Sequence, residues 1–191
     1  QITSIFRIAT PLNATVSCNG IIRKSGTKAQ SMRITILGTG TSTGIPMIGC
    51  KCAVCTSPDP RDRRLRTSAL IETINGNILI DAGPDMRQQL LGCGVRSLHG
   101  VLLTHAHQDH VGGIDDLRPL NSRMSAAIPL YGLPHTLSAI KERYHYAFAA
   151  SSGGSSRPNL TLEPLAAWRE CTVAETTIMP VSYTHLTLPT I

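Results

Sequence analysis

Thr104-His-Ala-His-Gln-Asp-His-Val-Gly-Gly113 is the stretch from which both the fold and the chemistry of this sequence are inferred. It directly follows the apolar run Val-Leu-Leu, which predicts a buried strand. In an extended chain, side chains two positions apart point to the same side, so His105 and His107 can bind one cation together. Asp109 and His110 lie where a helix is expected to begin, and Asp109 either caps that helix or faces a second cation.

Metal binding is the interpretation that these residue types favour. Imidazole nitrogen and carboxylate oxygen are common ligands of zinc, manganese and iron. The alternative is a polar loop with ordinary surface histidines, but four ligand-type residues within six positions, directly after a buried strand, argue against it. Gly112 and Gly113 then leave the start of the helix without side chains, so that a substrate can approach.

The regions around this stretch predict a mixed α/β layered fold. Toward the N-terminus, strands are expected at 33–37, 68–73 and 77–80, with a hairpin turn at Asn75-Gly76, and a helix at 84–91. Toward the C-terminus, the patterning predicts a helix at 111–117 that stops at Pro119, a strand at 128–131, a helix at 137–146, a flexible loop at 151–156 and two short strands within 172–180.

The two ends of the sequence differ from its middle. We expect residues 1–31 to be a non-native or disordered leader, with Met32 as the natural start. Residues 181–191 resemble the translated read-through of a sequencing-library adapter and are a suspected artefactual tail. A single domain over residues 32–180 remains, and we expect its C-terminal part to be missing.

Charge and composition exclude several classes of partner. The net charge is +6, but residues 1–31 hold four basic and no acidic residues, which leaves +2 for the rest of the chain. So small a charge disfavours a nucleic-acid partner, and an aromatic content of 4% disfavours base stacking. No stretch approaches the roughly 18 unbroken apolar residues of a membrane span. The sequence lacks a secretory leader pattern, so we expect a cytoplasmic protein; a homodimer is left open.

Three cysteines form a second group of ligand residues. Cys50, Cys52 and Cys55 lie within six positions, a spacing typical of a metal site rather than of a disulfide framework. Soft sulfur ligands select zinc, and a structural zinc site has four ligands, so the fourth must come from elsewhere in the protein. The alternative is three buried or incidental cysteines.

Several motifs resemble one known family in the same order along the chain. The stretch at 104–113 is similar to the H-x-H-x-D-H signature of the metallo-β-lactamase superfamily, and Asn77-Ile-Leu-Ile-Asp-Ala-Gly83 resembles the strand and aspartate that precede it there. Leu37-Gly-Thr-Gly-Thr-Ser-Thr-Gly44, the cysteine cluster and Asp115-Asp-Leu-Arg-Pro119 are similar to the phosphoribosyl cyclic phosphodiesterase branch. The resemblance implies a four-layer αββα sandwich, of which this sequence would supply the N-terminal half to two-thirds.

The resemblance also implies a site for two divalent ions, zinc or manganese. The ligands would be His105 and His107 for the first ion, and Asp109 and His110, which we also take as the catalytic residues, for the second. Asp81 would support the ligand loop from behind. The family needs a later histidine, a bridging aspartate and a final histidine; His185 stands near the expected place of the first of these, inside the suspected tail, and the other two have no candidate. The fourth ligand of the structural zinc would be a histidine near the C-terminus.

Three further polar features have weaker assignments. Arg64 or Arg66, in a basic run, either helps to hold a phosphate near the metals or belongs to a solvated loop. The glycine-rich loop at 38–44 lacks the P-loop lysine and the dinucleotide pattern, and we expect it to form a close backbone turn beneath the metal site. Asp115 would brace the helix after the metal loop through hydrogen bonds.

The functional hypothesis is a metal-dependent phosphodiesterase that cleaves a small cyclic or ribose phosphodiester. Two cations about 3.5–4 Å apart lower the pKa of a shared water, and the resulting hydroxide attacks phosphorus. The alternatives are another hydrolase of this fold, such as a nuclease or thioesterase, and a non-catalytic metal-binding protein of cofactor biosynthesis. The sequence as it stands is expected to be inactive, because too few ligands remain for two metals, and to fold poorly, because half a sandwich leaves an apolar sheet face uncovered.

Overall fold

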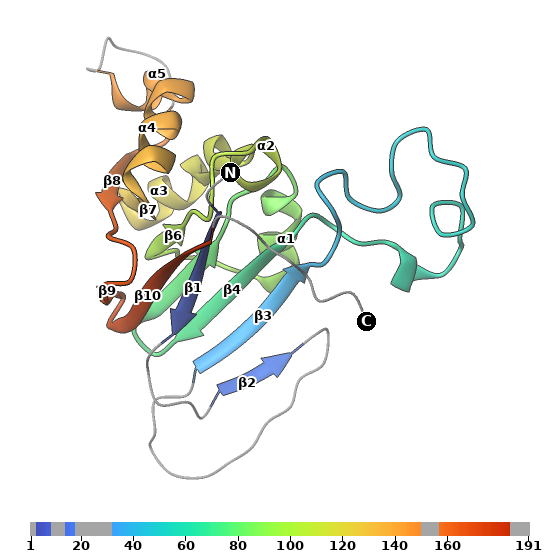
Figure 1. Ribbon diagram of the computed structural model, residues 1–191, viewed down its shortest axis with the longest axis horizontal. Coiled ribbons are helices and arrows are strands. Elements are labelled where there is room, and N and C mark those ends of the chain that lie inside the picture. The colour runs from blue at the N-terminus through green and yellow to red at the C-terminus, as the bar shows by residue number, and fades with distance from the viewer. Residues whose placement is uncertain (1–2, 9–13, 18–31, 150–156, 184–191) are drawn as a thin grey trace.

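A large mixed sheet forms the centre of the structure. The computed structural model describes residues 3–8, 14–17, 32–149 and 157–183. The seven strands, in their order across the sheet in Figure 1, are β2 (Ala14–Ser17), β3 (Met32–Gly38), β4 (Ser68–Thr73), β5 (Gly76–Ile80), β6 (Gly100–Leu102), β7 (Ile128–Gly132) and β8 (Leu160–Pro164). The neighbours from β3 to β5 are antiparallel, whereas those from β5 to β8 are parallel.

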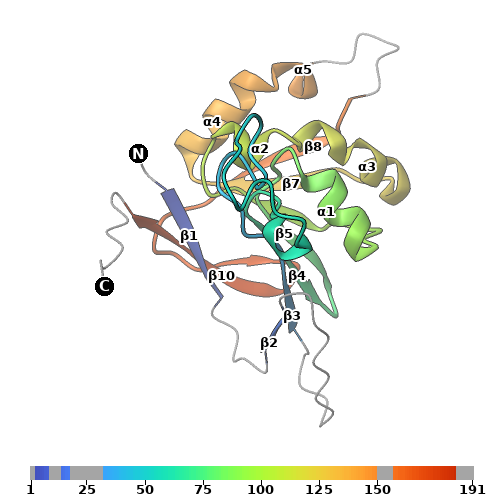
Figure 2. The same ribbon diagram turned by 90° about the vertical axis from the view of Figure 1, so that its right-hand side faces the viewer.

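Helices lie on one side of this sheet (Figure 2). They are α1 (Met86–Cys93), α2 (Gln108–Val111), α3 (Arg118–Met124), α4 (Pro134–Arg143) and α5 (His145–Phe148), with a 3-10 turn at Ile114–Leu117. A further 3-10 turn, Pro60–Asp62, lies in the connection between β3 and β4. Leu79, Val101 and Leu130 of the sheet form one buried cluster with Leu90 of α1 and Ile140 of α4. In the described part of the chain, no helix has the length and apolar character needed to cross a bilayer.

A second, three-stranded sheet packs on the other face of the large sheet. Its strands are β1 (Thr3–Ile8), β10 (Thr176–Tyr183) and β9 (Cys171–Val173), and each neighbouring pair is antiparallel. Ile71, Ile78 and Leu102 of the large sheet form a buried cluster with Val173 and Ile178 of the small one. The mixed α/β fold is therefore confirmed, with layers of helix, sheet and sheet in the order expected for the first three layers of an αββα sandwich.

The apolar sheet face that we expected to be uncovered is not found among the side chains that the structure describes. The small sheet covers it. The large hydrophobic side chains that are exposed come from loops, turns and helices: they are Met47, Ile48, Val54, Ile74, Leu91, Tyr146 and Trp168. The expected uncovered face is therefore absent among these residues, and the poor folding that we expected stays a prediction.

Strands were predicted more accurately than helices. The strands on both sides of Asn75-Gly76 pair as the expected hairpin. Instead of one helix at 111–117 that stops at Pro119, the chain forms α2, a 3-10 turn and then α3, which begins one residue before the proline. Proline is favoured in the first turn of a helix, so here it starts a helix rather than ending one. The helix expected at 137–146 begins at Pro134 and is interrupted at Tyr144.

Other differences concern the ends of the domain. Strand β8 was not predicted, and the loop at 151–156 lies outside the described residues. Two segments of the expected leader are strands, because β1 pairs with β10 and β2 pairs with β3. These segments differ from the disordered leader that we expected. Three expectations stay predictions: the domain bounds of 32 and 180, the non-native origin of residues 1–31, and the artefactual tail.

The parallel strands β5 and β6 end at the same edge of the large sheet. Ile80, the last residue of β5, is paired with Leu102, the last residue of β6. In open α/β sheets, binding sites form outside the carboxyl ends of parallel strands, where the following loops meet. Asp81 and the loop that carries the histidines leave the sheet at this edge, which places the candidate site there.

Candidate metal centre

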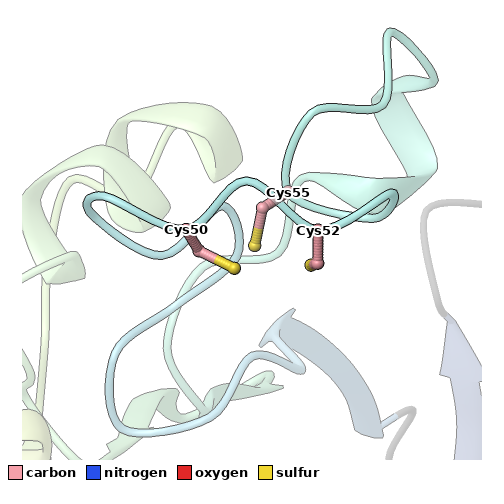
Figure 3. A group of neighbouring side chains, drawn as sticks. All are labelled: Cys50, Cys52 and Cys55. Carbon is pink, nitrogen blue, oxygen red and sulfur yellow. The ribbon is translucent and has the colours of Figure 1, made fainter.

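The cysteine loop carries one of two groups of ligand residues, and it projects from the body of the molecule (Figures 1 and 3). The sulfur atoms of Cys50, Cys52 and Cys55 all lie within 4.8 Å of one another. Met47 N–H donates to Cys55 Sγ at 3.4 Å. A backbone hydrogen bond from Cys55, followed by a contact with the Cys50 thiol, lowers the pKa of Cys52 to about 7, which favours the thiolate that zinc requires. This cluster could therefore hold a metal ion.

Asp81 is the buried carboxylate around which the histidine loop is organised. It follows β5 directly and is 2% exposed. Its φ of 59° lies in the left-handed region, which aspartate tolerates better than most residues. Its Oδ1 accepts a hydrogen bond from Thr104 N–H at 2.8 Å, and its Oδ2 accepts one from the Thr104 hydroxyl at 2.7 Å. His110 Nδ1 lies 2.6 Å from the same Oδ2, so one carboxylate fixes both ends of the loop.

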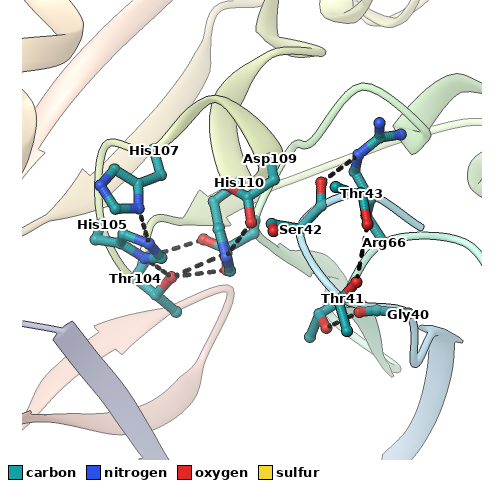
Figure 4. A network of polar contacts seen from close by, with 12 residues as sticks. Gly40, Thr41, Ser42, Thr43, Arg66, Thr104, His105, His107, Asp109 and His110 are labelled. Carbon is teal, nitrogen blue, oxygen red and sulfur yellow. Dashed lines mark hydrogen bonds and ion pairs between the residues drawn. The ribbon is translucent and has the colours of Figure 1, made fainter. Parts of the chain in front are cut away.

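The histidine loop, residues 104–111, presents its ligand atoms as two pairs (Figure 4). His105 Nε2 and His107 Nδ1 are 3.2 Å apart, and Asp109 Oδ2 and His110 Nε2 are 3.3 Å apart. Two ligands of one tetrahedral zinc ion, at bond lengths of about 2.0–2.1 Å, are separated by about 3.3 Å. The ring centroids of His105 and His110 are 4.1 Å apart, so the two pairs are neighbours. The spacing within each pair therefore matches that of two ligands of one cation.

Neither histidine-loop pair completes a metal site by itself. Among the described residues, the group whose three ligand atoms converge within 4.8 Å is the cysteine cluster, not the histidine loop. Catalytic zinc sites take three protein ligands, so each pair needs a further donor. His185, the sequence candidate for one of these donors, lies outside the described residues.

The pKa values of His105 and His110 shift in opposite directions. Burial, followed by the charge of His110, lowers the pKa of His105, which favours the neutral imidazole that binds metal ions. Burial alone would also lower the pKa of His110, but the hydrogen bond and charge of Asp81, with the charge of Asp109, outweigh it and raise that pKa above 6.5. The contact with Asp81 keeps Nδ1 occupied, so Nε2 is the nitrogen left to a metal, which must displace the proton that the raised pKa favours.

The segment after β5 docks directly on the end of the histidine loop. Ala82 N–H donates to the His110 carbonyl at 2.7 Å, and Gly113 N–H donates to the Ala82 carbonyl at 2.8 Å. A Cβ at Gly83 would overlap with the Asp109 carbonyl oxygen, and a Cβ at Gly113 would overlap with the Gly83 carbonyl. At Gly113, close packing of two backbone segments is therefore the reason for glycine, rather than the substrate access that we expected.

The two candidate phosphate-binding arginines make contacts elsewhere. Arg66 Nη1 lies 2.8 Å from Asp85 Oδ1, and Arg66 Nε donates to the Ser42 carbonyl at 2.9 Å (Figure 4). Arg64 pairs with Asp62 at 3.9 Å. No hydrogen bond or ion pair of the described residues joins either arginine to the histidine loop. Phosphate binding by these residues stays a prediction.

The other two expected supports of the site are visible as contacts. The glycine-rich loop forms a close backbone turn, because Gly44 N–H donates to the Thr41 carbonyl at 3.0 Å; its place beneath the metal site stays a prediction. Asp115 accepts hydrogen bonds from Arg118 Nη2 at 2.8 Å and from the Tyr146 hydroxyl at 2.7 Å. Asp115 thus braces the turn after the histidine loop and does not face the ligand atoms.

Thr104 is the residue of the site that the sequence argument missed. It donates twice to Asp81, and its hydroxyl lies 3.0 Å from His105 Nδ1. That contact leaves His105 Nε2 on the side of His107. A hydroxyl residue between a buried strand and a ligand histidine is the signal that could have identified it, because such a hydroxyl can reach a carboxylate at the end of the neighbouring strand.

Comparison with known proteins places this site in a family. The model of the beta-lactamase superfamily domain matches residues 76–190, which is more than half of the chain and includes Asp81 and the whole histidine loop. The chain belongs to the metallo-β-lactamase superfamily. The superfamily signature is the loop whose ligand atoms form the two pairs described above.

Three proteins that are similar to this chain carry different names. A solved structure of a new diphosphatase from the PhnP family is 37% identical, with a TM-score of 0.64, over 72% of this chain and 51% of that one. An octanoyltransferase of Porphyromonas gingivalis is 45% identical over 83% of this chain and 32% of its own length. Coenzyme PQQ synthesis protein B of Methylorubrum populi is 30% identical over 58% of this chain and 40% of its own length. The chain thus spans between about a third and a half of these relatives.

Proposed function

We propose that this chain carries the metal-binding loop of a hydrolase that cleaves a small cyclic or ribose phosphodiester. The proposal is based on the two pairs of ligand atoms in the histidine loop, which are 3.2 Å apart in the His105/His107 pair and 3.3 Å apart in the Asp109/His110 pair. Asp81 holds the second pair in place through His110 Nδ1. The 37% identity with a PhnP-family diphosphatase supports chemistry at phosphorus. Because the relatives are longer, the activity is proposed for the protein encoded by the complete gene.

Each residue of the loop has a separate task in this proposal. His105 and His107 hold one ion, and Asp109 and His110 hold the other. Two divalent ions, zinc or manganese, would lower the pKa of a water molecule and neutralise charge on the phosphate oxygens when bound. Asp81 keeps His110 Nδ1 engaged, so that this ring can offer only Nε2.

The cysteine cluster takes a structural part in the same proposal. Cys50, Cys52 and Cys55 hold one zinc ion, with a fourth ligand from another part of the protein. The ion cross-links the projecting loop, which lies between β3 and β4 and is far from the histidines along the chain. Its loss should therefore loosen this loop without removing the ligands of the hydrolytic site.

A turnover assay tests the hydrolase proposal. The product of the complete gene is incubated with bis(p-nitrophenyl) phosphate and Mn²⁺ or Zn²⁺, and release of nitrophenol is followed. We expect metal-dependent turnover that is lost in His105→Ala and kept in His145→Ala, a matched change at an exposed histidine of α5. Turnover that needs no metal, or that survives His105→Ala, would contradict the proposal.

A second candidate function is a metal-binding protein of cofactor biosynthesis. The 30% identity with a coenzyme PQQ synthesis protein B favours it. In that case the complete protein would bind metal ions at the histidine loop with no turnover of the phosphodiester. Measuring metal content and turnover on the same preparation separates the two functions.

A further inference from the structure

Helix α4 ends beside the histidine loop with two consecutive side chains that reach the backbone of the loop. The Tyr144 hydroxyl donates to the Val111 carbonyl at 2.7 Å, and Arg143 Nη1 donates to the Ala106 carbonyl at 2.8 Å. Ala106 lies between the two histidines of the first ligand pair, and Val111 directly follows the second pair. The two bonds therefore hold the loop at one point within each half.

These contacts come from a different part of the fold than those of Asp81. The carboxylate of Asp81 holds side chains and one N–H group from beneath, at the edge of the sheet, whereas Tyr144 and Arg143 hold carbonyl groups from the helical layer. Tyr144 is 8% exposed, so its partner carbonyl has little water to replace the hydroxyl. The bond from Arg143 is exposed but carries the charge of a guanidinium, which strengthens it.

We propose that Tyr144 and Arg143 are positioning residues of the metal loop: Tyr144 sets the Asp109/His110 pair, and Arg143 sets the His105/His107 pair. The proposal rests on the proposed function in so far as the loop binds metal ions. Ligand atoms bind one ion well only when they are held near its preferred geometry, and the groups that orient them typically change metal affinity 10–100-fold. Neither residue touches the reacting atoms.

The first test compares matched tyrosine variants of the product of the complete gene, loaded with Co²⁺. Tyr144→Phe removes one hydroxyl and no charge, and Tyr131→Phe removes a hydroxyl from a half-buried tyrosine of β7. Cobalt bound by nitrogen and oxygen lacks the sulfur charge-transfer bands of cobalt at the cysteines, so the two sites are distinguished in one spectrum. We expect Tyr144→Phe to weaken cobalt binding at the histidine loop about tenfold or more and to leave the signal of cobalt at the cysteines unchanged. Tyr131→Phe should leave the cobalt affinity of the histidine loop unchanged.

Arg143 needs a test that separates position from charge. Removing a positive charge near a cation site should by itself strengthen cation binding. Weaker binding in Arg143→Met therefore reports lost positioning, and Arg143→Lys, which keeps a donor and the charge, should restore part of it. Arg123→Met, at an exposed arginine of α3, is the control.

Amide hydrogen exchange without metal gives a second, independent readout. His110 and Val111 N–H groups both donate to the His107 carbonyl, at 3.0 Å and 3.1 Å. We expect these amides to exchange about fivefold faster in Tyr144→Phe than in Tyr131→Phe, with the amides of β4 unchanged. Equal exchange and equal cobalt affinity in the two tyrosine variants would overturn the proposal. If the unaltered product of the complete gene binds no cobalt through histidine, the proposed function fails, whereas the exchange rates, which need no metal, still decide the positioning role.

Discussion

Both carboxylate oxygens of Asp81 are bound by the histidine loop, so this one side chain links metal geometry to folding. Its partners are the N–H and hydroxyl of Thr104 and the Nδ1 of His110. A buried carboxylate is stable only when such partners satisfy it, and each bond to a charged group contributes about 1.5–3 kcal/mol. Asp81 therefore affects the free energy of unfolding as well as the affinity for metal.

Replacing Asp81 with asparagine should separate charge from shape. Asp81→Asn keeps the size but turns one acceptor into a donor that faces Thr104 and His110. We expect the free energy of unfolding in urea to fall by about 1–3 kcal/mol and the affinity for zinc in chelator competition to fall about 10–100-fold. Asp116→Asn, at an exposed aspartate nearby, should change neither quantity. Similar behaviour of the two variants would show that the Asp81 bonds carry little energy.

A methyl group at Gly83 should disturb the same contact from the backbone side. The added Cβ of Gly83→Ala would overlap with the Asp109 carbonyl oxygen, so the segment after β5 must move away from the loop. We expect a loss of about 1–3 kcal/mol in urea unfolding. Gly92→Ala, in helix α1 with open space around the new Cβ, should instead stabilise the protein by about 0.5–1 kcal/mol. Equal effects of the two changes would contradict the packing argument.

Residue types, but not their partners, could be predicted from the sequence. His105, His107, Asp109 and His110 were identified because ligand chemistry and spacing are local in the sequence. Thr104 was not assigned a role, because its importance depends on a carboxylate that follows a different strand. Such contacts depend on which strands are neighbours, and the sequence does not show this at the level of single residues.

At the scale of elements, the two ligand loops come from different connections of the large sheet. The cysteine loop joins β3 to β4, whereas the histidine loop follows β6. Turn hydrogen bonds hold the cysteine loop internally, from Cys50 N–H to the Met47 carbonyl at 3.1 Å and from Thr56 N–H to the Cys52 carbonyl at 3.0 Å. Metal binding at one loop should therefore change little when the other is altered.

Changing one cysteine should remove only the metal bound by the cysteine loop. Cys52→Ser takes one sulfur from a group of three, and two thiolates bind zinc far more weakly. We expect zinc retained per chain after dialysis, measured by atomic emission, to drop in Cys52→Ser and to stay constant in Cys93→Ser, at an exposed cysteine of α1. Unchanged zinc in Cys52→Ser would mean that the cluster is no metal site.

Helix ends were the least predictable elements, for a reason that Pro119 illustrates. Proline can end one helix or begin the next, and the local sequence does not distinguish the two cases. Here Pro119 lies in the first turn of a helix, since α3 begins at Arg118. Strand β8 was not predicted because it is short, with Pro158 just before it and Pro164 as its last residue. Its pairing with β7 is a tertiary contact, which the local sequence does not show.

At the scale of the whole molecule, the interface between the two sheets forms the second of two buried hydrophobic clusters of the described residues, beside the one between the large sheet and the helices. Ile178 of β10 is fully buried against Ile71, Ile78 and Leu102. The pairing of β1 with β10 joins the two ends of the described chain and has no local signal in either segment. The sequence could therefore predict the class of the fold but not which segments build its small sheet.

Truncating Ile178 should measure the contribution of the sheet interface. Ile178→Ala leaves a cavity between two layers, and we expect a loss of about 2–5 kcal/mol in the free energy of unfolding, from urea titration followed by circular dichroism. Ile74→Ala, the same change at a hairpin residue that is 79% exposed, should stay within about 0.5 kcal/mol. A small effect at Ile178 would show that the small sheet is not packed on the large one in solution.

The long loop between β3 and β4 can change in length and sequence. The two strands are adjacent and antiparallel, so the loop between them begins and ends at paired residues, Gly38 and Ser68. Closing a longer loop costs little, about 0.6 kcal/mol for each doubling of its length. The two ends of this loop lie at the same edge of the sheet as the histidine loop, since Ala69 of β4 pairs with Ile80 of β5, and Ile80 pairs with Leu102 of β6. The distant tip, rather than the residues next to the strands, can thus be shortened, lengthened or exchanged for an unrelated peptide while the histidine loop keeps its shape, which makes the tip a natural graft point.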